Sequence, residues 1–388
     1  MHSMMYFPAE EYAERVRRAR VLMEEQGIDA LVATAPNNIT YISGYRTNLF
    51  DSNFRPYFAL IPREGDPVLL LPSLESGVGE ETSWIQDQRA WGPNKGDIAP
   101  DGFSAIALVL ADKGLTKGKL AVERGFGQRI GMHLDAFVDL ESRMPDVEWA
   151  DGTAVFWKLR GLKSDAEVAN LRKAAEITDA AYEKVLSSAH EGISEREIQS
   201  ILGQEYMRLG SDYRGFIIVN AGPQRYKMMN PYASDYKLQR GDMCNIDFGA
   251  VYDGYWCDLT RGFFVGEVSD RQREFYEVAK AASAAAVDAV KPGVACEEID
   301  LVAERYLVDA GYKEYMLHRT GHSIGLEVHE LPSIGLGEKT VLQKNMVVAI
   351  EPGIYDFNIG GFRMEDIVLV TETGSEYLSN CQRELTIV

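Results

Sequence analysis

The first part of the chain alternates between helical and extended hydrophobic patterns. Helical spacing over residues 9–26 predicts a helix, and the apolar run that follows Gly27 has strand character. Short apolar runs at residues 57–61, 68–71 and 119–122 are separated by Gly and Pro turns, which predicts further strands. We therefore expect an N-terminal α/β domain over residues 1–155.

The remainder of the chain mixes long helical patterns with β-rich segments. Three helix starts carry a capping box, in which a serine and a residue three positions later each satisfy a free backbone N–H group. These pairs are Ser164 with Glu167, Ser194 with Glu197, and Ser269 with Gln272. A fourth helix is expected over residues 296–310, and β-rich segments lie near residues 214–220, 243–264 and 346–370. This mixture predicts a second domain of the α+β class over residues 160–388.

Composition narrows the class of protein. The chain has 388 residues, 46% hydrophobic and 26% charged, which is typical of a soluble globular protein with two or three domains. Its net charge of −19 disfavours nucleic acid and anionic membranes as partners. The sequence shows neither a membrane-spanning apolar run nor a secretory signal, so we expect a cytoplasmic protein. The four cysteines form no metal-binding or disulfide pattern and are expected to be buried thiols.

The segment of residues 244–258 carries two aspartates in a ribbon pattern. A four-residue loop over residues 251–254 would place Asp247 directly opposite Asp258, with Cβ atoms roughly 4.5 to 5.5 Å apart. Like charges at that separation destabilise a sheet, so a cation is expected between them. Strand alternation sends Cys244 and Cys257 to the opposite face. Taken alone, the aspartates could equally be solvated turn carboxylates.

Two later segments add histidines and further acids. Half of the six histidines, His318, His322 and His329, lie within 12 residues beside a Gly-rich turn. Glu351 and Glu365 interrupt apolar strands, and a symmetric turn between them would place them opposite each other. Four carboxylates and one imidazole carry a charge that two divalent cations would balance, as in two-metal hydrolytic sites. An oxygen-rich shell with one nitrogen favours ions such as Mn or Co.

The chain resembles the pita-bread metallohydrolases, which include aminopeptidase P, prolidase, methionine aminopeptidase and creatinase. The resemblance covers nearly the whole chain, and its strongest motifs are NIDFG with a later CD, TGHSIGLEVHE, IEPGIY and FRMED. It implies a pita-bread catalytic domain preceded by a smaller α/β domain. It also implies a homodimer and two divalent metal ions, with Mn expected first and Co, Zn or Fe as alternatives. The implied ligands are Asp247, Asp258, His322, Glu351 and Glu365.

The same resemblance implies catalytic roles. Glu351 would double as the general base, His329 resembles the proton-shuttling histidine, and His318 resembles the histidine beside the leaving-group pocket. Imidazole suits these roles because its usual pKa near 6.5 allows proton donation at neutral pH. Arg363 resembles an arginine that steadies a ligand carboxylate. The alternatives, a turn-capping surface histidine at His318 and an ordinary ion pair at Arg363, stay open.

The substrate side departs from the family pattern at one position. Seventeen residues before the first aspartate ligand, where relatives have a histidine, this chain has Asn230, followed closely by Tyr232. Asparagine can form hydrogen bonds but cannot carry a proton at pH 7. Residues 53–57 are similar to the creatinase loop in which an arginine of one subunit binds the substrate carboxylate of the other. Arg55 could act in this way, or it could be a solvated loop arginine.

These features predict a dinuclear-metal hydrolase that cleaves a peptide or amide C–N bond, as an Xaa-Pro aminopeptidase or an Xaa-Pro dipeptidase. Asn230 and Arg55 favour an alternative, a creatinase-like or ectoine-hydrolase-like hydrolase or lyase with a small non-peptide substrate. A catalytically inactive binding protein is a third possibility, against which the complete ligand set argues. Fold analogy alone does not choose among the three.

Overall fold

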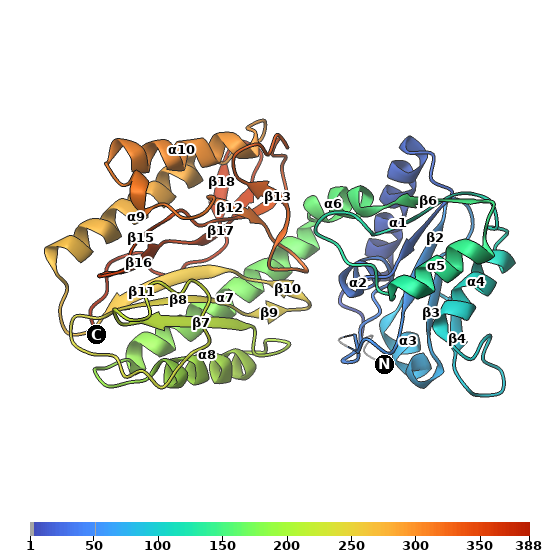
Figure 1. Cartoon of the computed structure of the whole chain (residues 1–388), viewed down its shortest axis with the longest axis horizontal. Coiled ribbons are helices and arrows are strands. Elements are labelled where there is room, and N and C mark those ends of the chain that lie inside the picture. The colour runs from blue at the N-terminus through green and yellow to red at the C-terminus, as the bar shows by residue number, and fades with distance from the viewer. Residues whose placement is uncertain (1–3, 51) are drawn as a thin grey trace. The chain divides into compact units, whose positions relative to one another are not determined.

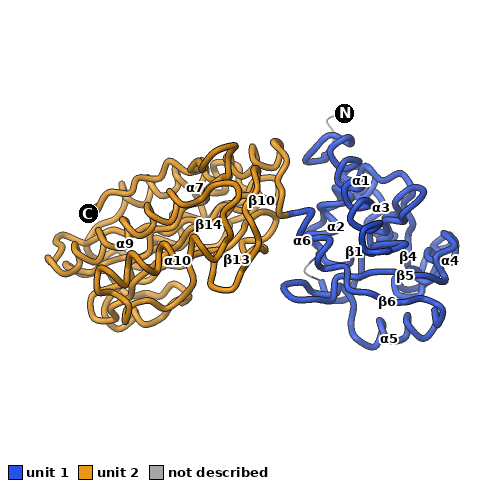
Figure 2. The backbone as a smooth tube through the Cα atoms, turned by 90° about the horizontal axis from the view of Figure 1, so that it is seen from above, with its two compact units in different colours: residues 1–160 blue, residues 161–388 orange. Residues whose placement is uncertain are grey.

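The computed structural model describes residues 4–50 and 52–388 (Figure 1). The chain divides into two compact units, Met1–Arg160 and Gly161–Val388 (Figure 2). Each unit contains both helices and strands. Among the described residues, no helix combines the length and the apolar character needed to cross a bilayer.

Unit 1 is built on a six-stranded sheet in the order β4-β3-β2-β1-β5-β6. The predicted helix and strands are confirmed as α1 (Ala9–Glu25), β1 (Ala30–Ala33), β2 (Phe58–Pro62), β3 (Val68–Pro72) and β5 (Gly118–Val122). The sequence analysis did not define β4 (Asp87–Trp91), β6 (Val147–Asp151), α2 (Pro36–Ser43), α3 (Ser76–Thr82), α4 (Gly102–Asp112), α5 (Leu134–Arg143) and α6 (Thr153–Gly161). Strands β1, β2 and β3 are buried along their whole length, which explains their continuous apolar runs.

Glu123 is a fully buried acid that directly follows β5. Its Oε1 accepts hydrogen bonds from the backbone N–H groups of Thr34 (2.8 Å) and Ala35 (2.7 Å) and from Nδ2 of Asn38 (3.2 Å). Its Oε2 has no hydrogen-bond partner among the described residues. Because burial disfavours the charged form, the pKa of Glu123 is raised to about 7. The carboxyl group therefore organises the start of α2 and holds a proton over much of the acidic pH range.

Unit 2 places its strands between two pairs of helices (Figure 1). The three predicted capping boxes are confirmed at the starts of α7 (Asp165–Ser188), α8 (Glu195–Leu209) and α9 (Asp270–Ala289), and α10 spans Cys296–Asp309. One sheet has the order β11-β8-β7 and another has the order β13-β12-β14-β17-β18. Apolar residues of α9 and α10 pack against β14 and β17 in a buried cluster.

The strands of unit 2 are short. The first sheet contains β7 (Phe216–Ala221), β8 (Met243–Gly249) and β11 (Leu259–Phe264). The second contains β12 (Gly321–Ser323), β13 (Glu330–Ile334), β14 (Val347–Ile350), β17 (Asp366–Val370) and β18 (Ser375–Tyr377). Two ribbons complete the unit, β9 (Val251–Tyr252) with β10 (Tyr255–Trp256), and β15 (Gly353–Asp356) with β16 (Gly360–Arg363).

The predicted four-residue loop at residues 251–254 is wrong. Tyr252 pairs with Tyr255, so the turn contains only Asp253 and Gly254, with φ values of 48° and 80°. An Asp-Gly pair favours such a turn because both central residues take positive φ. Asp247 consequently pairs with Thr260 instead of Asp258. Because the register differs by two residues, the two aspartates keep the same face and lie diagonally to each other.

The predicted register of the second acid pair is confirmed. Ile350 pairs with Asp366 in the β14–β17 ladder, and Gly353 pairs with Arg363 in the β15–β16 ladder. Glu351 and Glu365 lie between these ladders at matched positions. All four cysteines are buried and free, as predicted, and burial raises the pKa of Cys244 and Cys257 well above the usual thiol value.

The buried carboxyl group of Glu123 predicts a pH-dependent stability. Because the pKa of Glu123 is raised in the folded state, its contribution to the free energy of unfolding is complete below about pH 4.5. This contribution is lost as the pH rises through about 7. The loss amounts to at most about 3 kcal/mol. We expect Glu123→Gln, which mimics the protonated acid, to flatten the fall in the thermal unfolding midpoint between pH 5 and 8.5. Equal pH dependence in this variant and the wild type would contradict the prediction, and Glu64→Gln on an exposed loop serves as the control.

Candidate metal centre

One cavity of unit 2, with a volume of about 510 Å³, gathers nine of the eleven predicted site residues. Its polar lining consists of Asn230, Asp247, Asp258, His318, His322, His329, Glu351, Arg363 and Glu365. Its apolar lining consists of Phe216, Ile218, Met229, Leu317 and Val328. Tyr232, which is 96% exposed, does not line the cavity. Arg55 is half-buried in unit 1, between α2 and β2.

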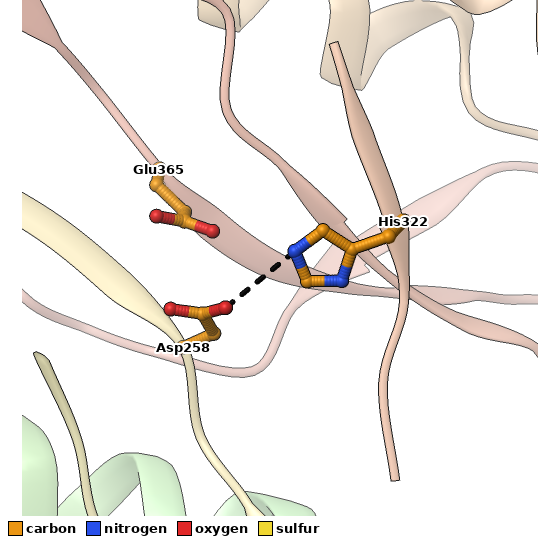
Figure 3. A group of neighbouring side chains, drawn as sticks. All are labelled: Asp258, His322 and Glu365. Carbon is orange, nitrogen blue, oxygen red and sulfur yellow. Dashed lines mark ion pairs between the residues drawn. The ribbon is translucent and has the colours of Figure 1, made fainter. Parts of the chain in front are cut away.

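The tightest group in the cavity is formed by Asp258, His322 and Glu365 (Figure 3). Each residue offers one ligand atom, and these atoms all lie within 4.8 Å of one another. His322 Nε2 lies 3.5 Å from Oδ2 of Asp258 and 3.6 Å from Oε1 of Glu351. Asp258 precedes β11, His322 lies on β12, and Glu365 lies between β16 and β17. Side chains far apart in the sequence thus converge from both sheets.

Three carboxylates in the cavity each keep one buried oxygen without a hydrogen-bond partner among the described residues. Oδ1 of Asp247, Oδ1 of Asp258 and Oε1 of Glu365 are buried and have no hydrogen-bond partner among the described residues. Burial, reinforced by repulsion from neighbouring carboxylates, raises the pKa of Asp258 and Glu365 well above the usual range. Burial also raises the pKa of Glu351 to about 7, although Arg363 opposes this shift. Unpaired buried oxygens of this kind fit a site for divalent cations.

The imidazole of His322 is held in the form that binds a metal. Burial, together with the neighbouring His329, lowers the pKa of His322 to about 3, so the ring is neutral at pH 7. Its Nδ1 lies 3.0 Å from the carbonyl oxygen of Ser323, a contact in which Nδ1–H donates. The lone pair of Nε2 is then directed toward Asp258 and Glu351. Four carboxylates and one neutral imidazole therefore line the same cavity.

Arg363 lies among the carboxylates and is linked to them by a threonine. Its Nη2 contacts Oδ2 of Asp247, and its Nε lies 3.7 Å from Oε2 of Glu365. The same Nε donates to Oγ1 of Thr260 at 2.8 Å, and this hydroxyl donates to Oε2 of Glu365 at 2.7 Å. Thr260 was not among the site residues predicted from the sequence. Strand alternation could have found it, because it lies two residues after Asp258 and shares its face.

The two other histidines border the same cavity. Nδ1 of His318 lies 2.8 Å from the carbonyl oxygen of Arg319, and its Nε2 lies 2.7 Å from the hydroxyl of Tyr355. Burial lowers the pKa of His318 to about 4, and it also lowers the pKa of His329. The ring centroid of His329 lies 4.3 Å from that of His322 in an edge arrangement. Both rings thus line the same cavity as the acids.

Comparison with known proteins explains this arrangement. Residues 169–372 match metallopeptidase family M24, and residues 15–162 match the Creatinase/Prolidase N-terminal domain. The chain belongs to metallopeptidase family M24. Membership confirms the predicted pita-bread fold with a preceding N-terminal domain, and it confirms that the chain is a metal-dependent hydrolase.

Similar members of family M24 match over nearly their whole length. The chain is 32% identical to the Xaa-Pro dipeptidase of Pyrococcus horikoshii, covering 96% of this chain and 98% of that protein. It is 33% identical to the probable dipeptidase PepE of Mycobacterium tuberculosis, covering 98% of each. The solved structure of the Xaa-Pro dipeptidase from Bacillus anthracis superposes with a TM-score of 0.86 at 30% identity, covering 97% of this chain and 100% of the other.

The link through Thr260 predicts an effect on metal affinity. Thr260→Val removes the hydroxyl that donates to Glu365 and accepts from Arg363, while it preserves the shape of the strand residue. Groups that orient ligands contribute about 10-fold to 100-fold in metal affinity, so we expect a loss of this size. Titration with Mn²⁺ against a competing chelator measures it. Thr373→Val, which changes an exposed threonine of the same unit, should retain the affinity, and an equal affinity in both variants would refute the role of Thr260.

Proposed function

We propose that this M24 member is a dinuclear-metal hydrolase that cleaves peptide bonds next to proline, as an Xaa-Pro dipeptidase or an Xaa-Pro aminopeptidase. The observation that carries the proposal is the convergence of Asp258, His322 and Glu365 with unpartnered buried oxygens at one cavity. Relatives named Xaa-Pro dipeptidase and X-Pro aminopeptidase support the substrate class. The apolar part of the cavity lining suits a proline ring and an apolar neighbouring side chain.

The proposed metal ligands are the five residues expected from the sequence, Asp247, Asp258, His322, Glu351 and Glu365. Their oxygen-rich donor set supports Mn as the first candidate, with Co, Zn or Fe as alternatives. When bound, two divalent ions supply Lewis-acid activation of water and polarisation of the scissile carbonyl. Arg363 keeps Asp247 in place and compensates part of the negative charge around the ligands.

The proton steps are assigned to Glu351 and His329. Glu351 lines the cavity, and its Oε1 lies 3.6 Å from Nε2 of His322, so its carboxylate is placed beside the other proposed ligands, as a general base acting there requires. His329 lines the cavity and is the least buried of its three histidines, so its ring nitrogens can reach a substrate. His318 is fixed by the Tyr355 hydroxyl and the Arg319 carbonyl, which supports a role in bordering the leaving group.

The substrate contacts, the assembly and the location complete the proposal. Asn230 lines the cavity and can form hydrogen bonds with a peptide group, while the contributions of Tyr232 and Arg55 stay predictions. The family resemblance supports a homodimer, and free buried cysteines support a cytoplasmic location. The substrate is a small peptide, since the net charge of −19 disfavours nucleic acid.

Loss of a central ligand should abolish metal binding and turnover together. Asp258→Ala and His322→Ala each remove one member of the tightest group, so the purified variants should bind fewer ions and show no hydrolysis above background. Metal analysis by mass spectrometry and an Xaa-Pro hydrolysis assay measure the two effects. Asp309→Ala, at the exposed end of α10, should behave as the wild type. An alanine variant at Asp258 or His322 that kept full activity would overturn the ligand assignment.

The substrate class predicts a defined panel result. Xaa-Pro dipeptides and Xaa-Pro tripeptides assayed with added Mn²⁺ should be cleaved at the bond before proline. A chelator should remove the activity, and Mn²⁺ should restore it. Matched Xaa-Ala peptides should be cleaved at least about tenfold more slowly, because the apolar wall favours the proline ring. If no Xaa-Pro peptide is cleaved, the proposed substrate is wrong and a small non-peptide amide becomes the next candidate.

A further inference from the structure

One segment of the cavity wall does not belong to the elements that carry the metal ligands. The loop of residues 222–234 follows β7 and supplies Met229 and Asn230 to the cavity. This loop includes the exposed residue Tyr232, and surface loops are commonly more mobile than the helices and strands that they connect. The position of Asn230 relative to the carboxylates therefore depends on what fixes this loop.

A single buried carboxylate holds both ends of the loop. Glu195 lies in the first turn of α8 and is fully buried. Its Oε1 accepts hydrogen bonds from the backbone N–H of Ala221 at 2.9 Å and from Nε of Arg225 at 2.7 Å. Its Oε2 accepts hydrogen bonds from the backbone N–H and the hydroxyl of Ser234, at 2.8 and 2.7 Å. All four donors belong to residues 221–234.

Two further side chains extend this support toward Asn230. Nη2 of Arg225 donates to the carbonyl oxygen of Tyr232 at 3.0 Å, two residues after Asn230. Nδ2 of Asn220, at the end of β7, donates to the carbonyl oxygen of Arg225 at 3.1 Å and also contacts that of Met228. The backbone is thus held on both sides of the two residues that enter the cavity.

The helix itself does not need Glu195. Ser194 and Glu197 form the capping box of α8, so the start of the helix is already satisfied. Burying a carboxylate is costly unless hydrogen bonds and a cation compensate it, and here the loop provides both. The hydrogen bonds of the Glu195 side chain therefore stabilise the loop and not the start of α8.

We propose that Glu195 is a positioning residue for substrate recognition, which holds the 222–234 loop so that Asn230 and Met229 face the substrate. The inference rests on the proposed function and adds to it a residue that touches neither metal ligands nor substrate. It separates recognition from metal binding. The proposed ligands lie on β8, directly before β11, on β12 and in the β14–β17 region, whereas the loop is held from α8.

The experiment compares Glu195→Gln with Glu197→Gln, a matched change two residues along the same helix that affects only the capping box. Displacing groups that orient a substrate is costly, so we expect Glu195→Gln to raise KM for Xaa-Pro peptides about tenfold. Its kcat and its bound metal should stay within about twofold of the wild type. Glu197→Gln should leave KM unchanged. Unchanged KM in Glu195→Gln, or parallel losses of kcat and metal, would overturn the proposal.

A second variant tests the same ion pair in case Glu195→Gln misfolds. A double-mutant cycle tests whether Glu195 acts through Asn230. Arg225→Gln removes the ion pair from the loop side, and it should raise KM in the same direction by a smaller factor. If Glu195 acts through Asn230, Glu195→Gln combined with Asn230→Ala should raise KM no more than the larger single change. Multiplicative effects on KM would overturn this route.

Amide hydrogen exchange separates failure of this inference from failure of the proposed function. Exchange at residues 221–234 should be faster in Glu195→Gln than in Glu197→Gln, and this measurement needs no substrate. If the wild type cleaves no Xaa-Pro peptide, the proposed function fails, while the exchange result still decides whether Glu195 fixes the loop. Equal exchange in the two variants would refute the positioning role.

Discussion

Electrostatic repulsion among buried acids is the constraint on which the catalytic unit depends. Asp247, Asp258, Glu351 and Glu365 line one cavity, and Arg363 is the only permanently charged base among the residues that line it. The guanidinium cannot balance four carboxylates, and several of their oxygens are left without partners. Folding thus brings together negative charges that the cavity lining does not balance, and the divalent cations proposed to bind there would relieve this electrostatic penalty.

Much of the fold and of the candidate site could be predicted because it depends on local chemistry. The capping boxes and the apolar strands follow from backbone hydrogen bonding and from burial. The matched positions of Glu351 and Glu365 follow from the two-residue period of strands and a symmetric turn. The resemblance of the motifs added the family, which the sequence and structure comparisons confirm.

Other features depend on turn length and on long-range hydrogen bonds, which the alternation of residues along a strand does not determine. The register at Asp247 was wrong because the Asp253-Gly254 pair forms a tighter turn than the predicted loop. Thr260 was overlooked because a threonine within an apolar strand is usually a β-former and not a hydrogen-bond bridge. The role of Glu195 could not be predicted, since its partners lie up to 39 residues away on a loop without regular structure.

The shared register of the β14–β17 and β15–β16 ladders has an evolutionary consequence. Glu351 and Glu365 lie at matched positions between these ladders. The turn at the tip of the β15–β16 ribbon, near residue 358, is separated from both acids by the paired residues of that ribbon. Insertions at that tip can accumulate without disturbing the acids. A single inserted residue next to Glu351 would instead invert the alternation and turn a carboxylate away from the cavity. Length variation among descendants of this chain should therefore concentrate at the tip.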